Sequence, residues 1–474
     1  MRGRTALVAA AAVAILAGTP TLPGIATAVD GTVTTVPATD GHLRFVGRWD
    51  RHYRGDESAT VNSGAYLIAR FEGDRLDGLF DTTDITYPPQ VWVTVDDGPR
   101  RLLDVDGADL RLTPAGLSPG AHTVRIDVKD TDQVTNRWLT PLNDAVVVRG
   151  LRVHGGDVLP PPPAAPVRMA FFGDSITEGI RALGDALTPD GADGTRAWAN
   201  LTARSFGADF AQVGFGKQGV MRDGVGNVPW APQSFGLNFA GSPADPAFRP
   251  DVVVLLQGSN DSQVTDEQFA PAYLDYLREV RGAYPDAWII AMVPLIGRHL
   301  SVIESDVRQL GDPKVVAVDT TGWLDRHDTA DYTDTVHPTV AGHLKVAQRL
   351  VPEIARVTGL PVVSSPVTAE AAPASVRTTG RSTVEVAVTV HRVLDTTTAP
   401  TRGTIAVTPP PGFTVPTARQ PYVLHDDTTT VPIRLVGALP PDSDQSTGVV
   451  RVLVDGQVEA LPIALTVTRE GSGS

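Results

Sequence analysis

A proline-rich run interrupts the chain about one third of the way along it: Leu159-Pro160-Pro161-Pro162-Pro163-Ala164-Ala165-Pro166. Proline lacks a backbone N–H and fixes φ, so this run forms neither a helix nor a sheet interior and predicts a stiff spacer. A second break, rich in Ala, Ser and Pro, covers residues 361–374. The chain has 474 residues, too many for one typical domain, and the breaks divide it into three. We expect domains at 35–158, 167–360 and 375–470, with linkers at 159–166 and 361–374.

The first and third of these segments alternate polar and apolar residues over short runs. Examples are Gln90–Val95 and His122–Val128 in the first segment and Thr383–Val390 in the third. Successive side chains of a strand point to opposite faces, so these runs, separated by turn residues, predict half-buried strands. We expect an N-terminal β-sandwich of jelly-roll type and a C-terminal, Ig-like β-sandwich that ends in a disordered Gly-Ser tail.

The middle segment has a different pattern, in which short apolar runs alternate with helical stretches. The apolar runs are 167–172, 208–213, 252–257, 288–293 and 315–318. In one helical stretch Phe269, Tyr273, Leu277 and Val280 recur at spacings of three and four, and a second stretch covers Val340–Val357. This alternation predicts a three-layer α/β domain with a mostly parallel sheet, whose ligands bind beyond the carboxyl ends of the strands.

Residues 1–28 have the features of a signal peptide, with two early arginines, an apolar run from Ala6 to Gly18 and the small residues Ala26-Thr27-Ala28. That run is too short to span a bilayer, and no other segment approaches about 18 apolar residues. We therefore expect a secreted protein. Lysine occurs at only four positions while arginine is abundant, which favours a GC-rich bacterial source.

Two features of the composition exclude classes of function. The chain has no cysteine, which excludes thiol catalysis and thiolate metal sites. Its net charge of −14 disfavours nucleic acid and anionic membranes as partners. A neutral substrate fits this charge better.

Four motifs of the middle segment fall at or just after the expected strand ends. They are Gly173-Asp174-Ser175, Val213–Gly219, Gln257–Asp261 and Asp334–Pro338. The first places a serine in a turn, and the second has glycines that let backbone N–H groups approach a ligand. The third offers the amide of Asn260, and the fourth a carboxylate and an imidazole three residues apart. We expect these motifs to meet at one edge of the sheet.

These residues supply the parts of a serine hydrolase. A serine hydroxyl is a weak nucleophile at neutral pH and needs a base, a role that an imidazole can fill. We predict Ser175 as the nucleophile, His337 as its base and Asp334 as the group that orients the imidazole. Attack on an acyl carbon creates an oxyanion, which needs donors fixed in advance. The candidate donors are the N–H of Ser175, the N–H of Gly216 or Lys217, and the side chain of Asn260.

The ordered set of motifs resembles the SGNH/GDSL hydrolase superfamily, named after its Ser, Gly, Asn and His blocks, over residues 167–358. The resemblance implies the same triad and an oxyanion hole completed by Asn260 and a glycine-block N–H. Two positions depart from the family's pattern. Lys217 stands where a second glycine is common, and Ile176 stands where the family's name has leucine.

An N-terminal β-sandwich fused to such a domain looks like carbohydrate esterase family two, which removes acetyl groups from plant polysaccharides. Some members of that family use a Ser-His pair alone, so the resemblance implies the role of Asp334 less strongly than that of His337.

Other residues have two interpretations each. Trp230, in a Gly-rich insertion, either stacks on a sugar ring above the site or packs its own loop. The acidic stretch Asp325–Asp331 is either a solvated loop or a calcium site. We expect Asp174 to brace its turn and Glu178 to cap or flank the next segment. The histidines lack metal-ligand spacing, and we predict no metal and no cofactor.

The leading hypothesis is a secreted serine esterase that hydrolyses short acyl esters, above all acetyl esters of carbohydrate, through an acyl-enzyme. A lipase or longer-chain ester hydrolase is an alternative, since the motifs fix the chemistry and not the acyl chain. In a third hypothesis the middle domain is inactive and the sandwiches bind polysaccharide or cell wall. For the N-terminal sandwich, a packing partner of the catalytic domain is the simpler interpretation. The sequence leaves the glycan, the acyl chain and the oligomeric state open.

Overall fold

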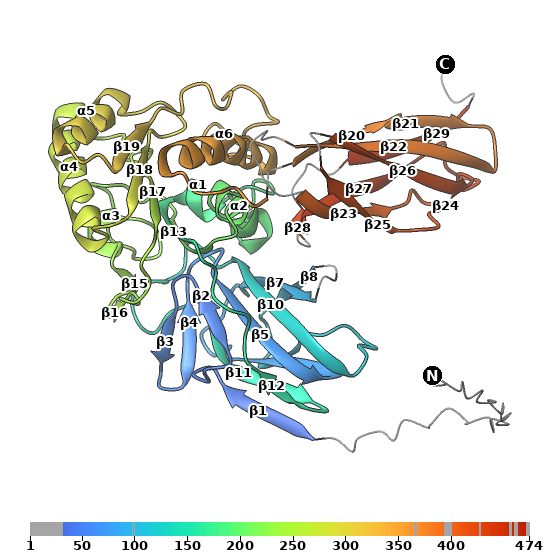
Figure 1. Cartoon of the computed structure of the whole chain (residues 1–474), viewed down its shortest axis with the longest axis horizontal. Helices are drawn as coiled ribbons and strands as arrows, with labels where there is room; N and C mark the ends of the chain where they lie inside the picture. Colours follow the sequence, from blue (N-terminus) through green and yellow to red (C-terminus); the bar gives the residue numbers. More distant parts are fainter. Residues whose placement is uncertain are drawn as a thin grey trace, which may run out of the picture.

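The computed structural model describes residues 32–96, 98, 100–364, 367–392, 401–425, 428–454, 457–458 and 463–470. The predicted signal peptide at 1–28 and the Gly-Ser tail at 471–474 lie outside these residues. Figure 1 shows a helix-containing middle domain with one β-domain below it and a second β-domain at its side. Within the described ranges, no helix is long and apolar enough to cross a membrane.

The N-terminal domain is a β-sandwich, as its alternating pattern predicted. One sheet has the order β3-β4-β11-β6-β9 with β1 paired to β11, and the other has the order β12-β5-β10-β7-β8 with β2 paired to β5. The strands are β1 (Val33–Pro37), β2 (Arg44–Val46), β3 (Asp50–Tyr53), β4 (Glu57–Thr60), β5 (Tyr66–Gly73), β6 (Arg75–Phe80), β7 (Gln90–Val95), β8 (Arg101–Asp104), β9 (Asp109–Arg111), β10 (Gly120–Asp130), β11 (Val146–His154) and β12 (Asp157–Leu159). Leu67, Ala69 and Phe71 of β5 alternate into the core between the sheets.

The middle domain has a parallel five-stranded sheet in the order β14-β13-β17-β18-β19, which confirms the α/β prediction. Its strands are β13 (Arg168–Asp174), β14 (Asp209–Phe215), β17 (Val252–Leu256), β18 (Trp288–Met292) and β19 (Val315–Val318). Its helices are α1 (Ser175–Glu178), η1 (Pro189–Gly191), η2 (Gly194–Arg196), α2 (Trp198–Ser205), α3 (Ala231–Ser234), α4 (Asp266–Ala283), α5 (Leu300–Leu310) and α6 (Val340–Thr358), and a small hairpin joins β15 (Leu237–Phe239) to β16 (Ser242–Pro243). The chain passes from β13 to β14 on one side and then returns to β17 on the other. The carboxyl end of β13 is therefore a topological switch point, where α/β folds bind ligands.

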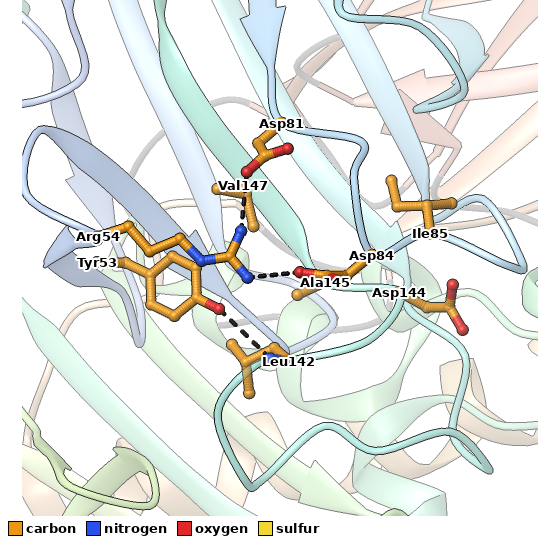
Figure 2. Close-up of a pocket in the computed structure, with 9 residues that line it drawn as sticks. All are labelled: Tyr53, Arg54, Asp81, Asp84, Ile85, Leu142, Asp144, Ala145 and Val147. Atoms are coloured by element: carbon orange, nitrogen blue, oxygen red, sulfur yellow. Dashed lines mark hydrogen bonds and ion pairs between the residues drawn. The ribbon is translucent and has the colours of Figure 1, made fainter.

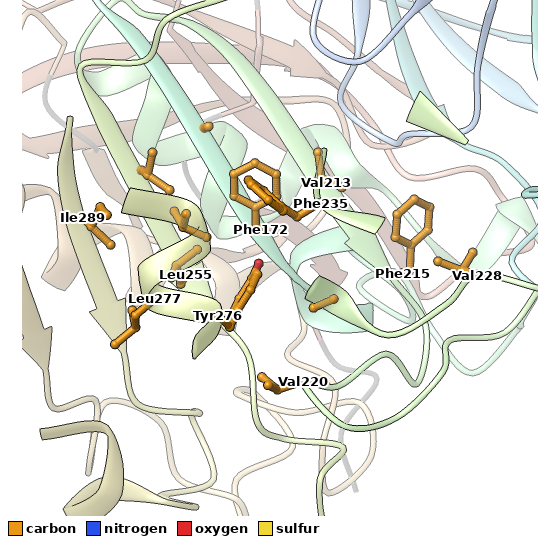
Figure 3. Packing of buried hydrophobic residues seen from close by; sticks show 14 of the residues in the cluster. Phe172, Val213, Phe215, Val220, Val228, Phe235, Leu255, Tyr276, Leu277 and Ile289 are labelled. Atoms are coloured by element: carbon orange, nitrogen blue, oxygen red, sulfur yellow. The ribbon is translucent and has the colours of Figure 1, made fainter. Parts of the chain in front are cut away.

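Helices cover both faces of this sheet because successive residues of its strands point to opposite sides. Phe172 faces a cluster with Phe235, Leu255, Tyr276 and Leu277, on the side of α3, α4 and α5 (Figure 3). The preceding residue, Phe171, belongs to a second cluster with residues of α2 and α6. The predicted α4 positions Phe269, Tyr273, Leu277 and Val280 are all fully buried in the first cluster.

The N-terminal sandwich packs directly on the middle domain through buried polar contacts. Tyr66 of β5 donates its hydroxyl to Asp209 at 2.9 Å, and Arg44 contacts the same carboxylate at 2.7 Å. The indole of Trp92 in β7 donates to Asp193 at 3.1 Å. Asp209 begins β14, so the sandwich contacts the amino end of a strand whose carboxyl end is at the switch point.

A second polar cluster of the sandwich, shown in Figure 2, pairs its own charges. Arg54, just after β3, contacts Asp81 at 2.9 Å and Asp84 at 2.5 Å, and the hydroxyl of Tyr53 accepts the N–H of Leu142. These contacts join the loops after β3 and β6 and serve the fold of the sandwich.

The C-terminal domain is a second sandwich, with one sheet in the order β20-β22-β26-β24 and another in the order β21-β29-β27-β23-β25, where β28 pairs with β27. Its strands are β20 (Val367–Ala372), β21 (Ser375–Thr378), β22 (Ser382–Arg392), β23 (Thr401–Thr408), β24 (Phe413–Thr414), β25 (Arg419–Leu424), β26 (Thr428–Gly437), β27 (Gln445–Val454), β28 (Gln457–Val458) and β29 (Ile463–Arg469). The predicted linker 361–374 contains β20, which pairs with β22 along its whole length. The strand forms because Val367, Ala369 and Ala371 alternate toward the core.

Candidate active site

Ser175 lies at the switch point, at the start of the short helix α1 that follows β13. The side chain of Asp174 accepts the N–H of Ile176 at 2.9 Å and so caps this helix, as expected for a residue that braces the turn. Gly173 is required at the strand end, because a Cβ there would lie 2.0 Å from the hydroxyl oxygen of Thr177. These constraints hold Ser175 at one position, where it is 6% exposed.

The imidazole of His337 lies between Ser175 and Asp334. Its Nε2 is 3.0 Å from Ser175 Oγ, and its Nδ1 is 2.8 Å from Asp334 Oδ2. The other oxygen of Asp334 accepts the backbone N–H groups of Val336 and His337, each at 2.7 Å. An Nδ1–H that donates to Asp334 leaves Nε2 free to accept the serine proton, which is the geometry of a catalytic triad.

The loop before α6 keeps Asp334 ionised. Burial alone would raise the pKa of Asp334, but the backbone N–H and ring of His337 and the N–H of Val336 outweigh it and hold this pKa well below its usual value. The carboxylate can therefore stabilise a positive charge on the imidazole at any pH near neutral.

A further residue, Arg181, contacts the triad and was not singled out from the sequence. Its guanidinium donates to Asp334 Oδ2 at 2.6 Å, and its carbonyl accepts the hydroxyl of Thr333 at 2.7 Å. Arg181 follows α1, so it connects the serine turn to the loop that carries His337. Sequence reasoning missed it because the contact joins residues 153 positions apart.

The glycine block after β14 forms a tight turn in which Gln218 donates its N–H to the carbonyl of Phe215 at 3.1 Å. The N–H of Gly216 lies close enough to the carboxylate of Glu178 to oppose the rise of that group's pKa. Lys217 follows with a φ of +61°, a conformation that glycine adopts more readily. Among the described residues, its N–H has no hydrogen-bond partner. Of the two backbone donors left open by the sequence, Lys217 is the one whose N–H does not lie beside a carboxylate.

Asn260 lies beside this turn. Its side-chain nitrogen donates to the carbonyl of Gln218 at 3.0 Å and is 3.3 Å from Asp174 Oδ2. The neighbouring Asp261 accepts the N–H groups of Val220 and Met221 at 3.0 and 2.8 Å. The motif that contains Asn260 and Asp261 thus fixes the glycine block. The amide of Asn260 lies between this block and the serine turn.

A buried ion pair lies behind the glycine block. Both guanidinium nitrogens of Arg137, which belongs to the N-terminal sandwich, contact the carboxylate of Glu178. The two side chains are 0% and 1% exposed. Burial raises the pKa of Glu178, while Arg137 and the N–H of Gly216 act in the opposite direction. Glu178 was expected to cap or flank a segment, and the structure instead places it in a buried ion pair with Arg137, beside the N–H of Gly216.

Other titratable groups near the site are shifted by burial. Burial raises the pKa of Asp174 to about 6, and Asp261 adds to this rise, whereas the N–H of Ile176 and the ring of His337 oppose it. Burial also lowers the pKa of His343, in α6, to about 3. The Nδ1 of His343 accepts the N–H of Trp198 at 3.3 Å, so this histidine is a neutral structural group.

The remaining candidates have structural contacts. Trp230 is 37% exposed and directly precedes α3, and the next residue, Ala231, donates its N–H to the carbonyl of Gly219 in the glycine block at 2.9 Å. In the acidic stretch, Asp331 contacts Lys345 at 2.5 Å and accepts the N–H of Asp325 at 2.9 Å. Across the described ranges, no group of three or more His, Asp or Glu side chains is arranged to hold a metal ion.

Comparison with known proteins supports a relationship over this domain. Residues 171–345 match the GDSL-like lipase/acylhydrolase family. The cellulase/esterase CelE of Acetivibrio thermocellus is 26% identical over 266 residues, which cover 52% of this chain. The match covers 31% of that relative, so the chain spans about a third of its length.

Solved structures with a similar fold include more of the chain. A family two carbohydrate esterase from Cellvibrio japonicus has a TM-score of 0.60 at 20% identity, over 70% of this chain and 99% of that one. A second esterase of that family, from Clostridium thermocellum in complex with cellohexaose, has a TM-score of 0.57 at 24% identity, over 67% and 99%. An acetyl xylan esterase from the rumen bacterium Butyrivibrio proteoclasticus has a TM-score of 0.56 at 18% identity, over 69% and 99%. These matches are larger than the middle domain alone, so they include a β-sandwich as well.

Proposed function

We propose that this chain, which belongs to the GDSL/SGNH hydrolase family through its middle domain, is a secreted serine esterase that removes acetyl and other short acyl groups from carbohydrate. The observation that carries the proposal is the hydrogen-bonded series from Ser175 to His337 to Asp334, with spacings of 3.0 and 2.8 Å. The carbohydrate substrate is supported by the esterases with a similar two-domain fold, one of which binds cellohexaose.

The reaction begins when His337 Nε2 takes the proton of Ser175 and the serine oxygen attacks the acyl carbon. The N–H groups of Ser175 and Lys217 stabilise the oxyanion of the tetrahedral intermediate, and the amide of Asn260 joins them by exchanging its 3.3 Å contact with Asp174 for the oxyanion. His337 then protonates the sugar oxygen, which leaves as a hydroxyl group, and the acyl group stays on the serine. A water molecule, deprotonated by His337, attacks the acyl-enzyme; His337 then returns this proton to the Ser175 oxygen as the acid leaves.

Asp334 and Glu178 act on this reaction through other groups. Asp334 keeps the Nδ1–H tautomer of His337 and stabilises the imidazolium that forms in both steps. Glu178 lies beside the Gly216 N–H and thereby fixes the turn that presents the next N–H, that of Lys217. Both are positioning residues.

Replacement of Ser175 by alanine tests the proposal. The wild-type chain should release acetate from acetylated xylan or glucomannan and p-nitrophenol from p-nitrophenyl acetate, with a steep fall for the butyrate and octanoate esters. Ser175→Ala should lose this turnover and keep the circular dichroism spectrum of the folded chain. Ser301→Ala, at an exposed position in α5, is the matched control.

The outcomes separate the alternatives. Turnover retained by Ser175→Ala would refute the mechanism. Faster hydrolysis of octanoate than of acetate would make the protein a lipase or long-chain esterase. No turnover of any ester by the wild-type chain would leave a carbohydrate-binding protein with an inactive domain.

A further inference from the structure

A cavity of about 450 Å³ lies where the three domains meet. It is lined by residues of β7, the segment before β8 and η2 on one side and of β23, β25 and β27 on the other, strands that Figure 1 labels. Its walls include Trp92 and Arg100 of the N-terminal domain, Arg196 of the middle domain, and Arg419 and Arg451 of the C-terminal domain. None of the triad or oxyanion residues lines it. Its volume is in the range of natural ligand sites, which often lie between domains.

The C-terminal wall is a row across three neighbouring strands. Ala406 of β23 pairs with Arg419 of β25 on one side and with Arg451 of β27 on the other. Its neighbours in β23, Ile405 and Val407, are buried in the core, so this row faces outward, into the cavity. The small Ala406 between two arginines leaves a groove with a guanidinium on each side. Neighbouring strands lie about 4.8 Å apart, so the two arginine backbones are about 10 Å apart.

The opposite wall carries two more arginines. Arg100 lies over the indole of Trp92, 4.8 Å from the ring centroid, and donates to the hydroxyl of Thr195 at 3.0 Å. Its Nε is buried and has no hydrogen-bond partner in the structure. Arg196 is 3.4 Å from Asp193, a carboxylate that also accepts the indole N–H of Trp92.

The cavity is therefore strongly positive in a chain with a net charge of −14. Four arginines line it, and no Asp or Glu is among the lining residues. Within the part of the chain that the structure describes, Arg100, Arg419 and Arg451 form no ion pair within 4 Å, and the carboxylates that attract Arg100, Asp127 and Asp193, do not line the cavity. The planar guanidinium group binds carboxylate and phosphate oxygens with two parallel hydrogen bonds.

We propose that this cavity binds an acidic glycan, with Arg419 and Arg451 contacting its carboxylate or phosphate groups from one side and Arg100 from the other. The anionic group explains the arginines, and the alanine-floored groove gives room for a sugar ring. The choice of a glycan rests on the proposed function, since a carbohydrate esterase that acts on a polymer gains from a second contact with the same chain. The anion itself follows from the arginines alone.

Calorimetric titration of the full chain tests this site. Ser175→Ala is the parent variant, so that binding is measured without hydrolysis and independently of the esterase proposal. The probes are trigalacturonate, a glycerol-phosphate trimer and neutral xylotriose. Arg419→Ala/Arg451→Ala removes the two guanidinium groups from the outer face of the sheet. Arg377→Ala/Arg434→Ala removes the same charge from exposed positions of the same domain and is the matched control.

We expect the parent to bind an acidic probe at least tenfold more tightly than xylotriose, with an affinity that falls as salt is raised. The Arg419/Arg451 pair of substitutions should lower this affinity tenfold or more, and the control pair should leave it within twofold. Preference for trigalacturonate identifies uronic acids as the source of the charge, and preference for the glycerol-phosphate trimer identifies phosphodiester groups as that source. Equal binding of neutral and acidic probes, no binding of either acidic probe, or equal losses in both double variants would overturn the proposal. Absence of esterase activity in the wild-type chain would contradict the proposed function and would not affect the proposed anion site.

Discussion

Replacing Arg137 with methionine should lower the free energy of unfolding by about 3–5 kcal/mol, the usual loss when one partner of a buried ion pair is removed. The side chains of Arg137 and Glu178 are 0% and 1% exposed, so water cannot replace the lost contacts. Methionine keeps the aliphatic volume and removes the charge. Arg54→Met is the matched control, because Arg54 also contacts two carboxylates but is 37% exposed (Figure 2), and its loss should cost less than about 1 kcal/mol.

The cost of Arg137→Met should depend on pH with a definite sign. Burial already raises the pKa of Glu178, and Arg137 opposes this rise. Without Arg137 the pKa of Glu178 rises further in the folded variant. Between the ordinary pKa of glutamate and this raised pKa, Glu178 keeps a proton in the folded variant that it releases in the unfolded chain. Stability then falls as pH increases from the unfolded pKa to the folded one. The variant should therefore be closest to wild type at mildly acid pH and furthest from it at neutral pH and above.

A double-mutant cycle with Glu178→Leu separates stability from catalysis. Each single substitution leaves one buried charge unpaired, whereas the double variant leaves none and should recover most of the lost stability. It should not recover kcat, because the N–H of Gly216 still lacks the carboxylate beside it and the turn that presents Lys217 is no longer fixed. A displaced oxyanion donor costs up to about 10²–10³ in kcat.

Urea unfolding followed by tryptophan fluorescence gives the stabilities, and p-nitrophenyl acetate hydrolysis gives kcat. The reasoning fails if Arg137→Met costs no more than Arg54→Met. It also fails if the double variant regains wild-type kcat, because Glu178 would then have no role beyond neutralising Arg137.

Three further predictions use other groups of the site. Asn260→Ala should lower kcat by about 10²–10³ with little change in KM, because its amide acts on the oxyanion; an equal rise in KM would contradict this. Lys217→Gly should keep kcat and raise stability by about 1 kcal/mol, since the backbone N–H remains and glycine adopts the observed φ of +61° more easily; a large loss of kcat would mean that the side chain takes part. His343→Asn keeps an acceptor for the N–H of Trp198 and removes a group whose folded pKa is about 3. Because the unfolded histidine binds a proton below about pH 6.5, wild type should lose about 2 kcal/mol more stability than this variant between pH 7 and pH 5, measured by urea unfolding.

The sequence predicted those parts of the site that depend on local geometry. A serine at the end of a buried strand and an Asp-His pair three residues apart each lie within one turn of chain, and the parallel sheet brings their strand ends to one edge. The choice between Gly216 and Lys217 could not be made in this way. It depends on the carboxylate of Glu178, which reaches the block from another strand end.

Contacts between segments that are distant in the sequence could not be predicted. Arg137 and Glu178 are 41 residues apart and belong to different domains, and Arg181 and Asp334 are 153 residues apart. Nothing in the spacing of such residues marks them as partners, because an arginine or a glutamate is equally compatible with an exposed position. The same limit applies to the cavity arginines, which come together only when three domains dock.

The N-terminal sandwich is therefore more than a neighbour of the catalytic domain. Gln133, in the sandwich loop after β10, lies so close to Gly216 that a Cβ on this glycine would be 2.3 Å from the side-chain oxygen of Gln133. Arg137, in the same loop, neutralises Glu178. One ion pair thus connects a sandwich residue to Glu178, whose carboxylate lies beside the turn that presents the Lys217 N–H. An isolated catalytic domain would leave the Glu178 carboxylate without Arg137. It would also lose Gln133, which packs against the glycine block. The two domains must therefore fold as one catalytic unit.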